Sequence, residues 1–350
     1  MRALRFHGKQ DVRVEDVDPP TPGPGQVRLR NGYAGICGSD LHVYYDPANA
    51  GLDFEHPHPI TGSMPPQILG HEFSGEVVEL GEGVDGLEVG DRVAVWPIYS
   101  CGECAACRAG RPNACVTIGF HGLTSDGGGM AEYTTVDASM LHRLPDGVDL
   151  RFGALVEPMA VAWRAVELSE VAPGGSAVVL GAGPIGIGAW YALRAKGVEP
   201  IVVSEPSPRR REAIAALGAE HLVDPTEQDL AEVVADLTGG DGADAVIDAA
   251  GVGVAVLQGI QALRPAGTFV VVALHEKGVE FNPTMLVMGE KRMVGSLAYL
   301  HEDFDAVIAA MADGLYDLTG WVEIVGLDEV EDAIGRLRAG DGLKILVEAR

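Results

Sequence analysis

Four of the five cysteines in the chain fall in one short segment with the spacing C-x2-C-x2-C-x7-C, namely Cys101, Cys104, Cys107 and Cys115. Four thiolates at such spacings can surround one tetrahedral ion, which is how a closed structural zinc site is built. Two disulfides and one buried thiol are the alternative. A two-residue gap strains a disulfide, however, and nothing else in the sequence is typical of a secreted protein. We therefore expect a structural zinc ion in this segment.

The fifth cysteine, Cys37, stands alone, well upstream of the adjacent pair His71 and Glu72. A lone thiolate with a distant histidine and a carboxylate matches an open, catalytic zinc site, which keeps one position for a reacting molecule. A histidine next to a glutamate is by itself an ordinary surface or core feature. The metal hypothesis for this pair therefore depends on the wider pattern.

A glycine-rich turn follows the apolar run 178–180 and opens an apolar helical stretch. Its first glycine permits the tight turn, its second lets the backbone approach a pyrophosphate, and its third allows the helix to pack closely on the strand. The phosphates would lie at the helix N-terminus. The pattern predicts a dinucleotide site formed by Gly181, Gly183, Pro184, Ile185 and Gly186.

An acidic residue, Glu205, ends the next apolar run, where the dinucleotide motif places its acid about 20 residues after the glycines. A carboxylate there accepts hydrogen bonds from the adenosine ribose and repels a 2′-phosphate, which predicts NAD as the cofactor. The run Arg209, Arg210 and Arg211 is the counter-evidence, since it could grip a phosphate or simply form the exposed start of a helix. We include Arg210 in the expected cofactor site.

The pattern of apolar runs and turn residues changes near residue 151. Before it, short β-like runs alternate with glycine-rich turns, which is typical of an all-β, barrel-like unit. After it, apolar runs alternate with helical stretches, which indicates a doubly wound α/β domain with a parallel sheet. The segment after Ser296 reads as acidic and helical until a final strand at 343–347, which is expected to rejoin the first domain. The apolar runs are 176–180, 200–203, 245–248 and 268–272.

The chain carries 51 Asp and Glu against 25 Lys and Arg, a formal net charge of −26. Such a surface repels nucleic acid and anionic membranes, so neither is expected as a partner. No run approaches the ~18 uncharged apolar residues of a spanning helix, and the first residues contain no leader-like segment, so a cytoplasmic protein is expected. The acidic excess predicts a halophilic protein, adapted to a salt-rich cytoplasm. A merely acidic enzyme from a GC-rich genome is the alternative.

The stretch Gly70-His71-Glu72-x2-Gly75-x5-Gly81-x2-Val84 resembles the zinc signature of the zinc-dependent medium-chain alcohol dehydrogenase family at every specified position. The four-cysteine segment and the glycine-rich turn follow in the family's order, and the resemblance covers essentially the whole chain. Within the family, the sequence is similar to the polyol branch, above all to its (R,R)-2,3-butanediol dehydrogenases. The stretches 56–62 and 295–299 carry this finer similarity.

The resemblance implies a fold and a set of metal ligands. The fold is an N-terminal GroES-like β-barrel catalytic domain at 1–157, with a zinc lobe at 97–118 and completion by 298–350, followed by a Rossmann domain at 158–297. Cys37 and His71 match two ligands of the catalytic zinc. Glu157 stands where the polyol branch has its third ligand in place of a cysteine. Glu72 lies beside the metal and is implied either to ligate it intermittently or to stay off it.

The implied reaction is NAD-linked oxidation of a secondary alcohol or vicinal diol to a ketone, of the butanediol–acetoin kind, with two zinc ions per chain. Ser39 and His42 match the proton-relay positions, and histidine suits the role because it titrates near neutral pH. A homodimer or homotetramer acting on a small alcohol is expected. The alternatives are sorbitol, glucose or L-threonine dehydrogenase, which share the metal and cofactor residues. An NAD-binding redox sensor would lack a ligand or relay residue, and none is missing here.

Overall fold

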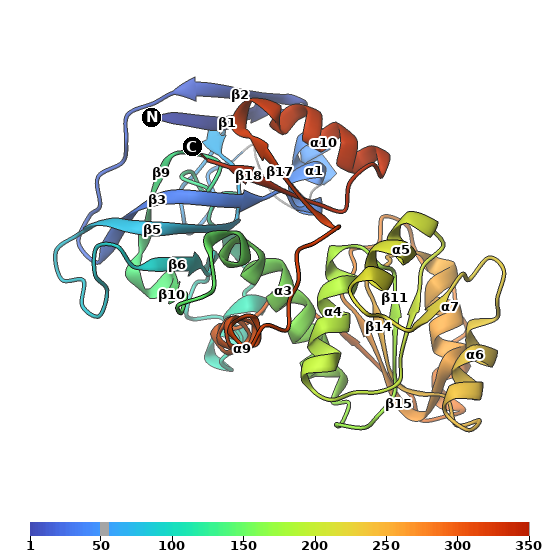
Figure 1. Cartoon of the computed structure of the whole chain (residues 1–350). Helices are drawn as coiled ribbons and strands as arrows, with labels where there is room; N and C mark the ends of the chain where they lie inside the picture. Colours follow the sequence, from blue (N-terminus) through green and yellow to red (C-terminus); the bar gives the residue numbers. More distant parts are fainter. Residues whose placement is uncertain (50–55, 350) are drawn as a thin grey trace. The chain divides into compact units, whose positions relative to one another are not determined.

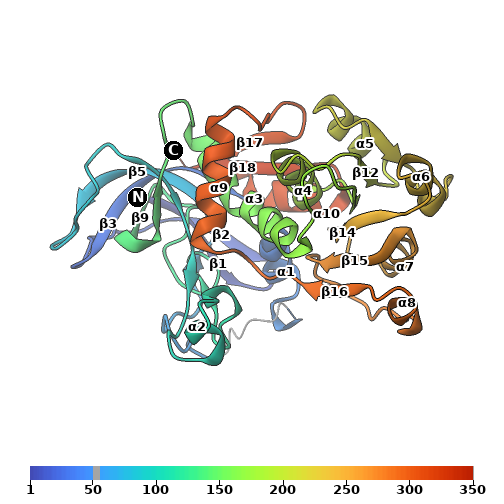
Figure 2. The same cartoon turned by 90° about the horizontal axis from the view of Figure 1, so that it is seen from below.

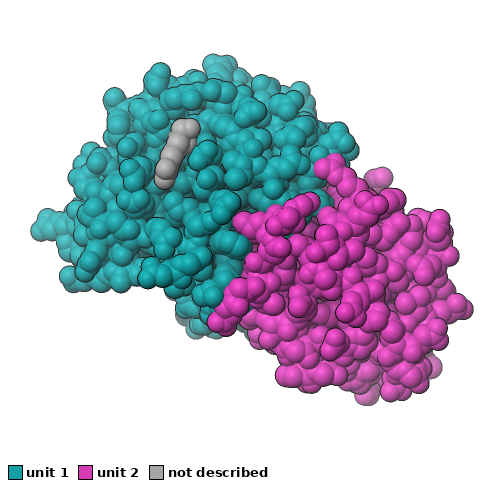
Figure 3. Space-filling model, viewed as in Figure 1, with its two compact units in different colours: residues 1–157, 300–312, 321–350 teal, residues 158–299, 313–320 magenta. Residues whose placement is uncertain are grey.

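The computed structural model describes residues 1–49 and 56–349, and the chain divides into two compact units. Unit 1 comprises residues 1–157, 300–312 and 321–350, and unit 2 comprises residues 158–299 and 313–320 (Figure 3). In the described part of the chain, no helix is long and apolar enough to cross a membrane.

Unit 1 is built on a seven-stranded sheet. Its strands are β3 (Gln26–Gly35), β5 (Glu72–Leu80), β6 (Arg92–Val95), β9 (Tyr133–Asp137), β10 (Leu141–Arg143), β17 (Val322–Gly326) and β18 (Lys344–Glu348). The order is β10-β6-β5-β3-β18-β17, and β9 also pairs with β3 (Figure 1). The C-terminal strand β18 therefore lies directly beside β3, so the final strand returns to unit 1.

Smaller elements complete unit 1. A second sheet contains β1 (Arg2–Gly8), β2 (Asp11–Asp16) and β4 (Gln67–Ile68), and β7 (Ile98–Tyr99) pairs with β8 (Gly119–Phe120). The helices are α1 (Gly38–Tyr45), α2 (Ala105–Arg108), α9 (His301–Ala312) and α10 (Val330–Ala339), and α3 (Leu150–Ser169) continues from unit 1 into unit 2. Short 3₁₀ turns lie at Pro47–Asn49, Pro112–Ala114, Ala138–Met140 and Leu327–Glu329.

Strand β3 shows why this sheet has one buried face. Val27 and Leu29 are fully buried, whereas Arg28 and Arg30 point to the other face, because successive strand residues alternate sides. Arg28 lies 2.7 Å from the Glu79 carboxylate on β5, directly opposite in the register. Opposite charges on facing residues stabilise the pairing of the two strands.

Strand β17 is a correction to the sequence analysis, which read the segment after Ser296 as helical until the final strand. The helices α9 and α10 are present, but residues 322–326 form a strand that pairs in parallel with β18. The short run Val322-Glu323-Ile324-Val325 has the β-branched residues of a strand, and the acidic surroundings obscured it.

Unit 2 contains a six-stranded, fully parallel sheet in the order β13-β12-β11-β14-β15-β16. This is the strand order of a doubly wound dinucleotide-binding fold, so the expected α/β class with a Rossmann sheet is confirmed. The strands are β11 (Ala177–Leu180), β12 (Ile201–Ser204), β13 (His221–Val223), β14 (Ala243–Asp248), β15 (Leu263–Val271) and β16 (Arg292–Gly295).

Helices lie on both faces of the parallel sheet. Helix α4 (Pro184–Ala195) packs on one face, and α6 (Leu230–Leu237) and α7 (Gly253–Ala262) pack together on the other (Figure 1). Helices α5 (Pro208–Ala216) and α8 (Thr284–Val287) complete the unit. The strands are almost continuously apolar, since both faces are covered: Val178, Val179, Val246 and Ile247 have no exposed surface.

His121 lies in the core of unit 1, and the sequence did not indicate a role for it. Its ring is 4 % exposed and stacks on Phe73. Nδ1 lies 2.8 Å from the hydroxyl of Tyr99, and Nε2 lies 2.8 Å from the carbonyl oxygen of Gly127. A neutral ring that donates from Nε2 and accepts at Nδ1 satisfies both partners. Burial lowers the pKa of His121 to about 4.

We expect His121 to make the protein less stable in mild acid. Because its pKa is lower in the folded than in the unfolded state, the unfolded chain binds the proton first. Stability is unaffected above about pH 7 and falls as the pH drops from 6.5 towards 4, by about 3 kcal/mol in total. Chemical denaturation of the wild type and of His121→Gln at several pH values would measure this. Between pH 6.5 and 4, the free energy of unfolding of the variant should fall by about 3 kcal/mol less than that of the wild type. If the free energy of unfolding of the two proteins changed with pH in the same way, the expectation would be contradicted.

Candidate metal centres and dinucleotide site

The four-cysteine segment forms a compact sulfur cluster in unit 1. Sγ of Cys115 lies 3.5 Å from Sγ of Cys101, and the Sγ atoms of Cys104 and Cys107 are also 3.5 Å apart. These distances exceed an S–S bond of about 2.05 Å and agree with four sulfurs around one ion at about 2.3 Å. All five cysteines of the chain are free thiols. The disulfide alternative is therefore disfavoured.

Backbone amides favour ionised sulfur in this cluster. The amides of Cys104 and Cys107 face Sγ of Cys101 and of Cys104, at 3.3 and 3.5 Å. Hydrogen bonds from the backbone lower the pKa of Cys104 to about 6, whereas burial and the adjacent thiols raise the pKa of Cys107 to about 11. Four thiolates cannot coexist without a cation, so the cluster fits zinc. Figure 2 shows α2, which contains Cys107, on a segment that projects from the strands of unit 1.

A second set of possible ligands, Cys37, His71 and Glu72, meets inside unit 1. One ligand atom from each lies within 4.8 Å of the others, and His71 and Glu72 are almost fully buried. The strands explain the convergence. Gly35 at the end of β3 is paired with Glu72 at the start of β5, so the chain leaving β3 brings Cys37 to the start of β5.

This second set also fits a cation. Burial and the Glu72 carboxylate raise the pKa of the Cys37 thiol, so the site without metal resists a second negative charge. Oε1 of Glu72 is buried and has no hydrogen-bond partner among the described residues. Buried polar atoms are rarely left in that state, and a zinc ion would satisfy the oxygen and favour the thiolate.

Asp40 is a functional candidate that the sequence analysis missed. It is 1 % exposed, and its Oδ2 accepts a hydrogen bond of 2.9 Å from the amide of Cys37, which precedes α1. Its Oδ1 lies 3.6 Å from Nδ1 of His71. Although burial opposes the change, Asp40 raises the pKa of His71. A carboxylate beside one ring nitrogen fixes the orientation of a metal-binding histidine. The sequence did contain an indication of this position, because Asp40 is the third residue of a helix that begins after Cys37, where an acidic side chain can bond back to the preceding backbone amide.

The other expected residues of this region lie outside the set of Cys37, His71 and Glu72. Glu157 is buried in α3, and its carboxylate is not among the groups that meet within 4.8 Å. Ser39 lies on α1 with Oγ 3.8 Å from Sγ of Cys37. His42 is half-buried on the same helix, three residues further on, so it shares a face with Ser39.

The glycine-rich turn in unit 2 has the geometry that the motif predicts. Gly181 follows β11 with a φ of +93°, a conformation that favours glycine, and Gly183 precedes α4. A Cβ on Gly186 would collide with the carbonyl oxygen of Gly181, so a side chain cannot be accommodated there. Pro184 occupies the first turn of α4, and Ile185 follows it. The turn therefore leaves its backbone and the N-terminus of α4 available for a pyrophosphate.

Glu205 lies against this turn. Its side chain is almost fully buried, Oε2 accepts a hydrogen bond of 2.8 Å from the amide of Ala182, and Oε1 accepts one of 2.9 Å from Ser207. Nη1 of Arg210 is 3.9 Å from the Glu205 carboxylate. The third arginine, Arg211, pairs with Asp224 at 2.9 Å. These contacts fix the carboxylate at the end of β12.

Two further groups of unit 2 were not found from the sequence. His275, which follows β15, places Nε2 2.7 Å from the carboxylate of Asp248 at the end of β14. Asp248 pairs with Leu180 in the register, so this contact lies at the same end of the sheet as the glycine-rich turn. Carboxyl ends of parallel strands are where dinucleotides bind.

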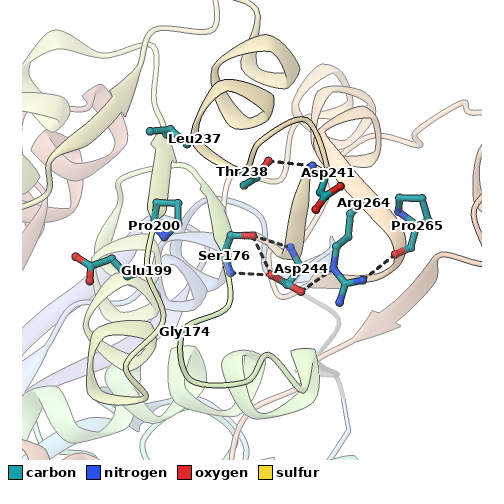
Figure 4. Close-up of a pocket in the computed structure, with 11 residues that line it drawn as sticks. Gly174, Ser176, Glu199, Pro200, Leu237, Thr238, Asp241, Asp244, Arg264 and Pro265 are labelled. Carbon is teal, nitrogen blue, oxygen red and sulfur yellow. Dashed lines mark hydrogen bonds and ion pairs between the residues drawn. The ribbon is translucent and has the colours of Figure 1, made fainter.

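One cavity of unit 2, of about 670 Å³, lies at the opposite end of the strands (Figure 4). Ser176 and Pro200, which line it, immediately precede β11 and β12. Three of its polar side chains are bonded to one another: Ser176 donates to Asp244 at 2.9 Å, and Arg264 donates to Asp244 at 2.6 Å. The cavity lies away from the glycine-rich turn, and we assign it no role.

Comparisons with known proteins agree with these sites. An alcohol dehydrogenase GroES-like domain matches residues 23–146, and a zinc-binding dehydrogenase domain matches residues 184–313. The chain is 40 % identical to the (R,R)-butanediol dehydrogenase of Bacillus subtilis (strain 168), over 99 % of each protein.

Solved structures give the same result. The crystal structure of the 2R,3R-butanediol dehydrogenase from Bacillus subtilis matches with a TM-score of 0.91 and 39 % identity, covering 100 % of this chain and 99 % of that one. A zinc-binding dehydrogenase from Sinorhizobium meliloti 1021 bound to NADP matches with a TM-score of 0.88 and 31 % identity, covering 99 % and 98 %. Cys37, His71 and the cysteine cluster lie in the first matched domain, and Glu205 lies in the second. The chain therefore belongs to the zinc-dependent medium-chain alcohol dehydrogenase family, whose cofactors are zinc and a nicotinamide dinucleotide.

Proposed function

We propose that the protein oxidises a secondary alcohol or vicinal diol to a ketone with NAD, and that the 2,3-butanediol and acetoin pair is its substrate class. The observation that carries the proposal is the buried convergence of Cys37, His71 and Glu72. The 40 % identity to a butanediol dehydrogenase over 99 % of the chain supports the choice of substrate.

The ligands of the catalytic zinc would be Cys37, His71 and a carboxylate. The family resemblance favours Glu157 as that carboxylate, whereas Glu72 lies within the convergent set and Glu157 does not. Zinc bound there would lower the pKa of the substrate hydroxyl, while NAD would accept a hydride. Asp40 would hold His71 by its Nδ1 and leave Nε2 for the metal. The cluster of Cys101, Cys104, Cys107 and Cys115 would hold the structural zinc.

The proton of the substrate hydroxyl would leave through α1. Ser39, whose Oγ is 3.8 Å from the sulfur of Cys37, would accept it. His42 shares a helix face with Ser39 and is half-buried, so it can exchange protons with solvent. This order of groups moves the proton away from the buried metal ligands.

The proposal also assigns a function to each domain of the chain. The catalytic domain would be 1–157 completed by 298–350, with the zinc lobe at 97–118, and the cofactor domain would be 158–297. The boundary between the two compact units after Glu157 supports this division. A cytoplasmic location fits the five free thiols, because reducing compartments keep thiols unpaired. The homodimer or homotetramer stays a prediction, which size-exclusion chromatography with light scattering would check.

A substrate panel tests the function. Purified protein with its zinc would be assayed with NAD and 2,3-butanediol isomers, sorbitol, glucose and L-threonine, and in reverse with acetoin and NADH. We expect the highest kcat/KM with a butanediol isomer, together with acetoin reduction. A preference for sorbitol, glucose or threonine would move the chain to that activity within the family. Absence of turnover with all of them in zinc-replete protein would contradict the proposal.

We expect kcat/KM to be higher with NAD than with NADP. The Glu205→Ser variant should show a smaller difference in kcat/KM between the two cofactors. Glu205 is held at the end of β12 by two backbone amides, where its charge would repel a 2′-phosphate. Removing the carboxylate should raise kcat/KM with NADP by about tenfold or more, which corresponds to about 1.4 kcal/mol. The comparison is kcat/KM for both cofactors in the wild type, Glu205→Ser and the control Glu212→Ser. A wild type that prefers NADP would show that Arg210 dominates the site.

A further inference from the structure

We propose that Lys344 is a positioning residue of the catalytic zinc site, and that its ammonium group sets how strongly Glu72 engages the metal. The inference rests on the proposed catalytic zinc at Cys37 and His71, beside which Glu72 lies. It adds a residue from the C-terminal strand, far from the metal signature in the sequence, that neither the zinc motif nor the dinucleotide motif contains.

Lys344 is unusual in this molecule because it is buried. Its exposed fraction is 2 %, and it is the only lysine or arginine among the described residues that is buried. The chain has only 25 lysines and arginines against 51 acidic residues, so a lysine that is buried instead of balancing the acidic residues at the surface is unexpected. Burying a charge costs free energy unless the charge is paired and hydrogen-bonded. The position of Lys344 therefore requires a local partner.

That partner is Glu72. Nζ of Lys344 donates to Oε2 of Glu72, and it also donates a hydrogen bond of 3.0 Å to the carbonyl oxygen of Ile36. Ile36 immediately precedes Cys37, so one ammonium group contacts both the carboxylate and the segment that carries the thiolate. The other oxygen of Glu72, Oε1, has no hydrogen-bond partner in the part of the chain that the structure describes. Lys344 thus holds one oxygen of the carboxylate and leaves the second for the metal.

The fold brings three strand ends together at this point. Gly35 at the end of β3 is paired with Glu72 on one side and with Leu346 of β18 on the other. Lys344 begins β18, two residues before Leu346. The pair lies directly against the backbone of β3, and a Cβ on Gly35 would collide with the Glu72 carboxylate and come within 3.0 Å of Nζ of Lys344. A glycine at position 35 is therefore required by the ion pair.

The charges explain what the contact does. Glu72 and the buried Glu157 supply negative charge, as does the Cys37 thiolate once zinc is bound, and Lys344 is the one buried lysine or arginine among the described residues. While Lys344 holds Oε2, Glu72 is partly neutralised and binds the metal weakly. Without Lys344, Glu72 would be an uncompensated carboxylate beside the zinc and would bind it with both oxygens. The same carboxylate would lack any counter-ion once zinc is removed, which strongly destabilises a folded chain.

Lys344→Met therefore has two opposite expected effects. Release of the catalytic zinc to a chelator should be slower by about tenfold, whereas the melting temperature of protein depleted of that zinc should fall by several degrees. A purely structural lysine would change both in the same direction, because a loosened site loses zinc faster. The measurements are zinc release followed with a colorimetric chelator and thermal unfolding with and without the catalytic zinc. Lys344→Arg, which keeps the charge, should stay close to the wild type.

Glu72→Gln provides the reciprocal test and remains available if Lys344→Met does not fold. It leaves an unpaired ammonium group facing the metal, so zinc release should be faster, and Lys344→Met added to it should restore the rate towards that of the wild type. Lys291→Met is the matched control, because Nζ of Lys291 donates to the carbonyl oxygen of Ile260 at 2.6 Å in unit 2. It should leave zinc release unchanged.

Three results would count against the proposals, and they can be told apart. Faster zinc release in Lys344→Met, without rescue by Glu72→Gln, would overturn the role of Lys344. An unchanged release rate in a wild type and a variant that both hold two zinc ions would also overturn it. A wild type that binds only the zinc of the cysteine cluster would instead contradict the proposed function itself.

Discussion

Replacement of Cys37 by serine is expected to lower NAD-dependent turnover by more than about 100-fold while one zinc ion remains bound. Loss of an outer partner of a metal ligand costs up to about 100-fold, and loss of a ligand itself should cost more. A serine hydroxyl does not ionise near neutral pH, so it cannot replace the thiolate as a zinc ligand. The fold should survive, because the amide of Cys37, not its sulfur, makes the hydrogen bond to Asp40.

The matched control is Cys107→Ser in the cysteine cluster. Sγ of Cys107 faces the sulfurs of Cys104 and Cys101, at 3.5 and 4.0 Å, and belongs to a different set of possible ligands from Cys37. This variant should lose the structural zinc and have a lower melting temperature, but it should retain the catalytic zinc. Elemental analysis, steady-state rates and thermal unfolding would be compared for both variants. Turnover in Cys37→Ser similar to that of the wild type would remove Cys37 from the catalytic site.

Melting temperature and activity are expected to rise between about 0.1 M and about 2 M salt. A net charge of −26 gives strong self-repulsion in the folded state. The Debye length falls from about 10 Å to below 3 Å over this range, which screens that repulsion. Salt also weakens the surface ion pairs, but such pairs contribute at most about 1 kcal/mol each. A net gain of about 2 kcal/mol corresponds to about 4–8 °C in units of this size.

The same experiment addresses the catalytic zinc. If carboxylates complete the ligand set in place of a second thiolate, the ion should be lost before global unfolding on dialysis into low salt. Zinc content at both salt concentrations would be measured alongside the melting temperature. Equal stability and full zinc retention at both would mean that the acidic surface is not a salt adaptation. The halophilic character proposed from the charge would then be withdrawn.

Local spacing accounts for the features that were predictable from the sequence. The cysteine cluster and the glycine-rich turn are each encoded in a short run of residues, so their geometry follows from neighbours in the chain. Glu205 was predictable because one strand and its following turn place it. In these cases the side chains that act together are separated by few elements.

The remaining residues depend on pairing between distant strands. Lys344 and Glu72 are separated by 272 residues, and only the packing of β18 against β3 brings them together. His121 appears unremarkable in the sequence, and its low pKa arises from burial that no local pattern reveals. His275 meets Asp248 only because parallel strands end at the same edge of the sheet. Sequence patterns carry no direct record of such contacts.

The most direct test of the account is the relation between zinc content and activity in the wild type. Protein with two zinc ions per chain would be treated with a chelator at high salt, and NAD-dependent butanediol oxidation and bound zinc would be measured in the same samples. We expect activity to fall in proportion to the first zinc ion lost, to reach zero at one zinc per chain, and to return when zinc is added. Full activity in protein that holds one zinc per chain would contradict a catalytic zinc held by Cys37, His71 and a carboxylate.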